Sequence, residues 1–234
     1  MRKWMTLVLL ALAMLAACTL SLAEGEGSVV QSSCSVVQSG DYYLVYCYAQ
    51  IHNNTDKVIC LERGTFELHS GEQLLATQEV EKIWPGMIAP GGEGYAFGVV
   101  AFEPDENGEP VVPHITGLTY DIEYMAVDAA FASIDLPVDA QIERDASGGM
   151  SVLCTVHNDT AADAFGAAVT FGLYTDGGAM VYADGMTLRS VGVPAGDSVI
   201  VRFALDDAIV DQWNAYGANI TQVRAAASYR DGTD

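Results

Sequence analysis

The stretch VYCYAQIHNNT, residues 45–55, decides the fold because the chain contains it twice, the second time as MSVLCTVHNDT, residues 150–160. In both copies apolar side chains stand at every second position, and a turn rich in Asn, Asp and Thr follows. Side chains that alternate in this way lie on one face of a β-strand. We therefore expect each copy to cover a core with these side chains: Val45, Cys47, Ala49 and Ile51, and Met150, Val152, Cys154 and Val156.

Further blocks of sequence recur along the chain. A Thr-Phe-x-Leu strand returns 105 residues later, like the first stretch, and a Pro-Gly corner returns 104 residues later, a difference that one deletion explains. Blocks matched at nearly one spacing indicate a duplicated module. The matched pairs are residues 65–69 with 170–174, Tyr124 with Tyr229, and Pro90-Gly91-Gly92-Glu93 with Pro194-Ala195-Gly196-Asp197.

Each half consists of short strands separated by turn residues, and neither has a 3.6-residue periodicity long enough for a core helix. Gly71 and the pair Gly177-Gly178 are typical of hairpin turns. The Asn-rich corners hold residues that bond their own backbone and tolerate a positive φ. The inward side chains that we expect are Phe66 and Leu68, matched by Phe171 and Leu173, and Tyr95, Phe97 and Val99 resume the alternation, matched by Val199, Val201 and Phe203.

One-sided strands are buried most simply when two antiparallel sheets face each other, so the sequence predicts an all-β fold with two sandwiches. We expect the first sandwich over residues 28–131 and the second over residues 136–234. They should meet near residues 132–138, where Pro137 interrupts the strand pattern.

Residues 1–23 are typical of an export signal. Arg2 and Lys3 precede an apolar run that is too short to span a bilayer as a helix. Leu15-Ala16-Ala17-Cys18 then resembles a bacterial lipobox, which predicts lipid attachment at Cys18 and a short tether to the first sandwich. The alternative is cleavage after Ser21-Leu22-Ala23, which would release a secreted protein.

The order of strands and corners resembles the FxLYD family of bacterial extracytoplasmic domains. The second half carries the motif best, as Phe171-Gly172-Leu173-Tyr174 with Asp176 one position late, whereas the first half has His69 in the tyrosine position. The resemblance covers residues 43–126 and 148–230. It implies two tandem immunoglobulin-like antiparallel β-sandwiches after the signal peptide of an exported lipoprotein, and it implies no activity.

The charge balance excludes two classes of partner. Acidic residues outnumber basic ones by 31 to 10, which gives a net charge of -21 at pH 7. Such a charge repels phosphate backbones and anionic lipid headgroups, so we expect neither nucleic-acid binding nor polybasic docking to a membrane. The membrane is expected as a partner only through the lipid on Cys18, with the protein facing outside the cell.

Residues with catalytic or metal-binding chemistry do not form a motif. The histidines have no zinc-finger spacing, and no serine stands in a Gly-x-Ser-x-Gly context. The acidic turn at residues 105–109 offers oxygen ligands but lacks the spacing of an EF-hand, so we expect a solvated loop, with a calcium turn as the alternative. We therefore expect no enzymatic activity, no metal and no cofactor. The four histidines are His52, His69, His114 and His157.

Aromatic residues provide the one candidate binding surface. Opposite its apolar face, the first strand presents Leu44, Tyr46 and Tyr48. These tyrosines either pair across the sheet or pack where the two halves meet, or else they stack on a glycan or dock a partner protein. The sequence leaves both interpretations open. The second half has Ser151, Leu153 and Thr155 at these positions.

Cys34 and Cys47 flank a two-residue turn, Gly40-Asp41, that predicts a β-hairpin. Closing this turn places the two cysteines directly opposite each other, within reach of a disulfide. Export permits oxidation, but the other half has no cysteine pair at the matching positions. A disulfide and two reduced thiols are both open, while Cys60 and Cys154 are expected to be free and buried.

These features favour a noncatalytic, surface-tethered binding or structural module of a bacterial cell envelope. The alternative is an accessory subunit that captures substrate for an envelope enzyme or transport system. A protein or glycan partner fits either function, and the sequence identifies neither.

Overall fold

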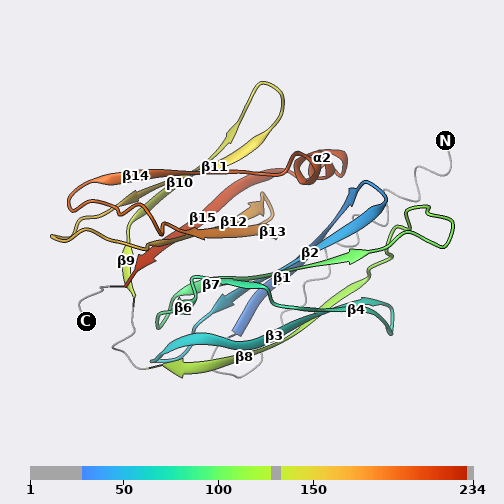
Figure 1. Ribbon diagram of the computed structural model, residues 1–234, viewed down its shortest axis with the longest axis horizontal. Helices are drawn as coiled ribbons and strands as arrows, with labels where there is room; N and C mark the ends of the chain where they lie inside the picture. Colours follow the sequence, from blue (N-terminus) through green and yellow to red (C-terminus); the bar gives the residue numbers. More distant parts are fainter. Residues whose placement is uncertain (1–27, 128–132, 231–234) are drawn as a thin grey trace.

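The computed structural model describes residues 28–127 and 133–230, which are mostly antiparallel strands (Figure 1). The expected all-β class is therefore confirmed. The strands are β1 (Ser28–Ser39), β2 (Tyr42–His52), β3 (Val58–Ser70), β4 (Gln73–Glu79), β5 (Lys82–Trp84), β6 (Met87–Ile88), β7 (Glu93–Phe102), β8 (Gly117–Val127), β9 (Ile134–Leu136), β10 (Val138–Arg144), β11 (Met150–His157), β12 (Ala168–Thr175), β13 (Met180–Thr187), β14 (Ser198–Ala204) and β15 (Ile220–Tyr229), and the helix is α2 (Asp207–Ala215).

Two sheets make up the first half of the chain. One has the order β1-β2-β7-β5, and in the other β3 pairs with β4, β6 and β8. Phe66 and Leu68 from β3 are fully buried between these sheets, and so are the four alternating side chains of β2. Burial of apolar surface is the main favourable contribution to folding, so the period-2 pattern of the sequence specifies this core.

The second half is built in the same way. Its sheets are β10-β11-β14 and β13-β12-β15-β9, and the predicted inward residues of β11 and β12 are buried between them. Phe171 packs on Phe203 of β14 with 4.8 Å between the ring centroids. The aromatic pair joins the two sheets of this half.

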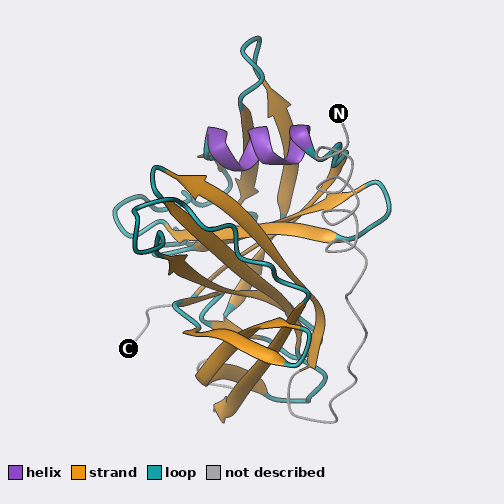
Figure 2. Cartoon of the chain, turned by 90° about the vertical axis from the view of Figure 1, so that its right-hand side faces the viewer, coloured by secondary structure: helices purple, strands orange, loops and turns teal. Residues whose placement is uncertain are grey.

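The sequence predicts no core helix, and the helix α2 shows that this prediction is wrong (Figure 2, purple). The Asp206 side chain caps the helix by accepting a hydrogen bond of 2.8 Å from the backbone N–H of Ala208. Ile209, Val210 and Trp213 are buried in the core of the second half. A helix of about two and a half turns presents too few apolar residues for a clear 3.6-residue period, so the pattern did not reveal it.

The Asn-rich corners after β2 and β11 share one set of hydrogen bonds. Asn53 is fully buried, and its side-chain amide donates to two backbone carbonyls at 2.7 and 2.9 Å. Asn158 is also fully buried and donates to two carbonyls at 2.8 Å each. Within the described residues only glycines have a positive φ, so side-chain bonds rather than an unusual backbone hold these corners. The acceptors are Lys57 and Ile88 in the first half and Ala162 and Val193 in the second.

The same offset of 105 residues continues through the Pro-Gly corner. Gly91 and Gly196 both have a positive φ, and their N–H groups donate to the backbone oxygens of Asn53 and Asn158 at 2.9 and 2.7 Å. The deletion expected from the matching prolines is therefore wrong. The prolines occupy different positions of one turn.

The uniform offset of 105 residues changes which side chains of β7 are matched with the inward side chains of β14. At the uniform offset Ala96 matches Val201, and both are buried inside their own halves. The expected match of Tyr95, Phe97 and Val99 with inward residues of β14 is wrong, because register places these side chains on the outer face of β7, opposite Ala96. A one-residue error in alignment exchanges the two faces of a strand.

The four sheets are stacked as layers, and the halves meet through β1-β2-β7-β5 and β13-β12-β15-β9 (Figure 1). Leu136 of β9 pairs with Ala227 of β15, so the second half includes Ile134 and Asp135, which the predicted boundary at residue 136 left out. Within the two described ranges, no helix has the length and apolar character needed to cross a membrane. The expected leader and Cys18 lie outside the described residues.

Candidate functional site

An aromatic interface joins the two halves, formed by the outer faces of β2 and β7 against β12 and β13. The side chains at its centre are buried, and Tyr48 and Tyr174 are 0% exposed. Because the buried rings come from both halves, the halves pack as one body in this structure. The central residues are Tyr48, Tyr95, Tyr174, Met180 and Ala183, with Tyr46, Phe97 and Tyr182 packed around them.

Glycines of the second half make room for aromatic rings of the first. A β-carbon on Gly172 would lie 2.8 Å from the ring of Tyr95, and one on Gly185 would lie 2.7 Å from the ring of Trp84. The Tyr95 ring passes over Gly172 to reach Tyr174, and the two hydroxyls share a hydrogen bond of 3.0 Å. The two surfaces are therefore complementary in shape at these points.

Polar groups contribute at the edge of the interface. The Gln31 side chain donates to the backbone oxygen of Gly178 at 3.2 Å and accepts from the N–H of Met180 at 2.9 Å. Other polar atoms of this face are buried without a hydrogen-bond partner among the described residues, which costs free energy. The interface is accordingly more polar than the two cores. These atoms are Ser33 Oγ, Tyr48 Oη, Gln50 Oε1 and Trp84 Nε1.

The candidate binding strip of Leu44, Tyr46 and Tyr48 lies on this side of the first half. The Tyr48 ring is 5.3 Å from the ring of Tyr182, while Tyr46 is half-buried and packs against the second core. Leu44 is also half-buried. Tyr48 therefore makes the contact between the halves, and its ring is not open to a glycan or a partner protein.

One carboxyl group sits beside the interface in a partly dry environment. Burial raises the pKa of Asp184, while a 2.7 Å hydrogen bond from the Gly185 N–H and the charge of Lys82 oppose that shift. The Tyr182 hydroxyl donates to Asp184 at 3.4 Å. Burial, and then the charge of Asp184, raise the pKa of Tyr182. Burial thus shifts both groups toward their neutral forms.

Cys34 and Cys47 face each other in the β1–β2 hairpin, in the register that the turn predicts. Gly40 has a φ of 62° in that turn. Both side chains are thiols in this structure, and burial, followed by the proximity of Cys34, raises the pKa of Cys47. Cys154 is buried as expected, whereas Cys60 is only half-buried.

The acidic turn at residues 105–109 uses its first carboxylate internally. Asp105 accepts hydrogen bonds of 2.9 Å from the backbone N–H groups two and four residues later, and Asp145 does the same at 2.9 Å in the second half. These bonds lower the pKa of Asp105, while the pKa of Asp145 is lowered first by a 2.6 Å hydrogen bond from the Ser147 hydroxyl and then by these backbone bonds. The solvated-loop interpretation explains the turn without calcium. In the described part of the chain, no cluster of three His, Cys, Asp or Glu could hold a metal ion.

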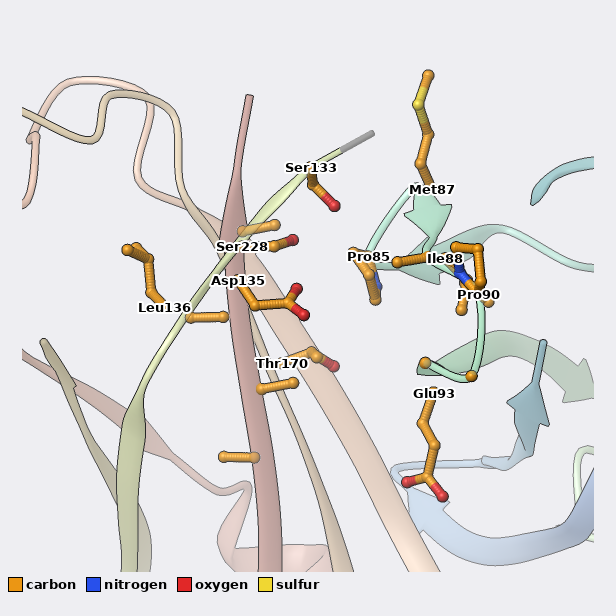
Figure 3. A pocket seen from close by; sticks show the side chains of 17 residues that line it. Pro85, Met87, Ile88, Pro90, Glu93, Ser133, Asp135, Leu136, Thr170 and Ser228 are labelled. Carbon is orange, nitrogen blue, oxygen red and sulfur yellow. The ribbon is translucent and has the colours of Figure 1, made fainter. Parts of the chain in front are cut away.

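A cavity of about 320 Å³ lies where the two halves meet, and its lining starts directly after Trp84 of the aromatic interface (Figure 3). Its size is at the lower end of the range for small-molecule sites. The wall from the first half is mostly apolar: it contains Pro85, Ile88 and Pro90, together with the carboxyl group of Glu93. The wall from the second half points side-chain oxygens toward it, from Ser133, Asp135, Thr170 and Ser228 (Figure 3).

Sequence reasoning did not predict the cavity. A signal was present, because Ala225–Ser228 stand 105 residues after Tyr120–Glu123 and have smaller side chains throughout. Small residues in one copy at positions where the other copy has large ones mark a surface that something else approaches. The residues that line the cavity from the first half show no such consistent difference in side-chain size between the copies.

Comparison with known proteins places the chain in no family. No family profile matches it, and no curated protein is similar to it in sequence. Among solved structures, a beta-glucuronidase from glycoside hydrolase family 2 has 11% sequence identity and a TM-score of 0.20. The match covers 94% of this chain and 23% of that enzyme's chain. A TM-score this low supports no argument about fold or function.

Proposed function

We propose that the chain is a noncatalytic, surface-tethered binding or structural module of a bacterial cell envelope. It consists of two immunoglobulin-like sandwiches of the FxLYD type, held at the membrane by a lipid on Cys18. The aromatic interface carries this proposal, since buried rings from both halves fix the two sandwiches relative to each other. A fixed pair presents a surface at a defined height and orientation, which a flexible linker would not do.

Duplication of one ancestral sandwich accounts for the similarity of the halves. The buried asparagines Asn53 and Asn158 make equivalent hydrogen bonds 105 residues apart, and the glycine turns that bind them keep the same offset. A corner of this kind has no catalytic use and serves to connect strands. The duplicated elements are thus structural.

The tether would hold the module close to the membrane. Ser28 is ten positions after Cys18, and an extended chain spans at most about 3.6 Å per residue, so the reach is about 36 Å. Ser28 pairs with His52, which in turn pairs with Glu93 of the cavity lining. The end of the molecule that holds the cavity would therefore be the end nearer to the anchor.

The cavity favours a second candidate function, capture of a small substrate for an envelope enzyme or transport system. It is lined by both halves and combines an apolar wall with directed oxygens, which is the general composition of small-molecule sites. In this role another chain would perform any chemistry.

Labelling of cells with radioactive palmitate tests the tether. The wild type should be labelled and remain with the membrane, and C18S should be unlabelled. C34S is the matched control and should keep the label. A wild-type protein that is unlabelled and accumulates in the medium would contradict the tether and support cleavage after Ala23.

Small-angle X-ray scattering of residues 24–234 tests the fixed pair. The distance distribution should have the single maximum of a four-layer stack. A two-lobed distribution would show that the halves move independently, and the proposed fixed pair would then be wrong.

A further inference from the structure

We propose that the cavity between the halves binds a primary ammonium group carried on a short aliphatic chain. The proposal rests on the binding role proposed above, but it does not depend on the lipid anchor. It follows from the two walls of the cavity, which differ in chemistry.

The oxygen wall favours a cation with several hydrogen-bond donors. Asp135 of β9 can only accept when ionised, and in the register of the sheet it lies opposite Ser228 of β15. Thr170 is 1% exposed and donates its hydroxyl proton to the backbone oxygen of Asp184 at 3.2 Å, which leaves its lone pairs to accept. An ammonium group has three N–H donors and no acceptor, so it matches such a wall.

Ser228 adds a hydroxyl to the oxygen wall. It is 6% exposed, and its hydroxyl has no hydrogen-bond partner among residues 28–127 and 133–230. In Figure 3 its oxygen points across the cavity, on the same side as the Asp135 carboxylate. A hydroxyl that faces the cavity in this way can accept a hydrogen bond from a donor group bound there.

The opposite wall selects the rest of the ligand. Pro85 and Pro90 offer carbon surface to an aliphatic chain, and Ile88 behind them belongs to the first core. The lining contains no Lys, Arg or His, and it includes the carboxyl group of Glu93 besides that of Asp135. An anion would therefore meet like charge, and the net charge of the whole chain, -21, adds to that repulsion.

The test uses the exported chain, residues 24–234, labelled with ¹⁵N and titrated with n-butylammonium chloride, n-butanol or sodium butyrate. Butylammonium should shift the amide signals of Gly91, Gly92 and Ala226 saturably, with a millimolar Kd as expected for so few heavy atoms. Butanol should bind more weakly because it lacks the charge, and butyrate should not bind.

Three variants locate the site. D135N should raise the Kd of butylammonium roughly three- to tenfold, which corresponds to loss of a partly exposed ion pair. D121N removes an exposed strand carboxylate remote from the cavity and should leave the Kd unchanged. A226L fills the cavity without changing charge and should abolish the shifts, while unfolding curves check that each variant is folded.

Several outcomes would overturn the proposal: no saturable shift, equal shifts with butanol, or a Kd that D135N leaves unchanged. Shifts at the same amides with calcium chloride that D135N abolishes would assign the cavity to a metal ion instead. Loss of palmitate labelling would contradict the tether alone, and butylammonium binding by the soluble chain would still stand.

Discussion

Replacement of Gly172 by alanine should lower the free energy of unfolding by about 1–3 kcal/mol, the usual cost of overpacking. The new β-carbon would lie 2.8 Å from the Tyr95 ring, which is 4% exposed and bonded to Tyr174 through its hydroxyl. The ring cannot move aside without loss of that bond. In a strand without such a neighbour, the same substitution stabilises by about 0.5–1 kcal/mol, so the interface reverses the expected sign.

Urea unfolding followed by tryptophan fluorescence measures the effect, with Trp84 reporting directly on the interface. G177A is the matched control, because its nearest neighbour would be 3.7 Å away, and it should change stability by less than about 0.5 kcal/mol. Y95A removes the clash, so the double variant G172A/Y95A should lose less than the sum of the single variants, by about 1–3 kcal/mol. A G172A protein as stable as the wild type would refute the packing of the two halves described above.

Three further predictions concern other parts of the molecule. N158A should destabilise by about 2–4 kcal/mol because the buried carbonyl of Val193 and the partly buried carbonyl of Ala162 lose their donor, whereas D159A on the exposed side of the same corner should change urea stability by less than about 0.5 kcal/mol. The pKa of Asp184 is raised on folding, so its contribution to stability is present at low pH and decreases as pH rises from the ordinary Asp range through the raised value. The D184N variant should therefore gain stability relative to the wild type as pH rises through that window. A stability difference between D184N and the wild type that is constant with pH would contradict this. Alkylation of the unfolded, unreduced protein, read by mass spectrometry, should modify both Cys34 and Cys47 if they are thiols, as in the structure, and neither if export has oxidised them.

The side chains that face each core could be predicted because their positions depend on the local sequence pattern. Alternation places Val45 and Val152 in their cores whatever covers the other face, and the turn at Gly40 fixes the register that brings Cys34 opposite Cys47. These features need no knowledge of distant segments. The Pro-Gly corner shows the limit, since a match of prolines by letter displaced the alignment by one residue and exchanged the faces of β7.

The contacts of the outward-facing side chains could not be predicted, because alternation shows which side chains share a face of a strand but not what lies against that face. Tyr48 was correctly placed opposite the core side chains, yet nothing local distinguishes a ring that meets solvent from one that meets Tyr182. The cavity is harder still. Its walls come from the loop before Glu93 and from strands about 40 to 135 residues farther along the chain.

The two halves meet through sheets that are not equivalent, and this explains differences between their sequences. The first half uses the sheet that contains β2, whereas the second uses the sheet that contains β12, the counterpart of β3 rather than of β2. Such a head-to-tail contact leaves one copy of each surface uncovered. Accordingly the tyrosine strip of β2 has no match in β11, whose strand lies in the outer sheet.

In the first half, the counterpart of the β12 surface lies on β3 and β8 and is not covered by the other half. Its residues differ from those of the covered surface in the opposite direction. Tyr174, buried at the interface, corresponds to His69, which bonds to Thr119 on the exposed face of the first half. Ala226, which lines the cavity between the halves, corresponds to Asp121, and both residues are exposed. Charged and polar residues thus stand where the surface meets water, and small or aromatic ones where it meets the other half. The presence of His69 where the second half has Tyr174 therefore follows from its position in the stack, and the same reasoning identifies the outer face of β3 and β8 as solvent-facing.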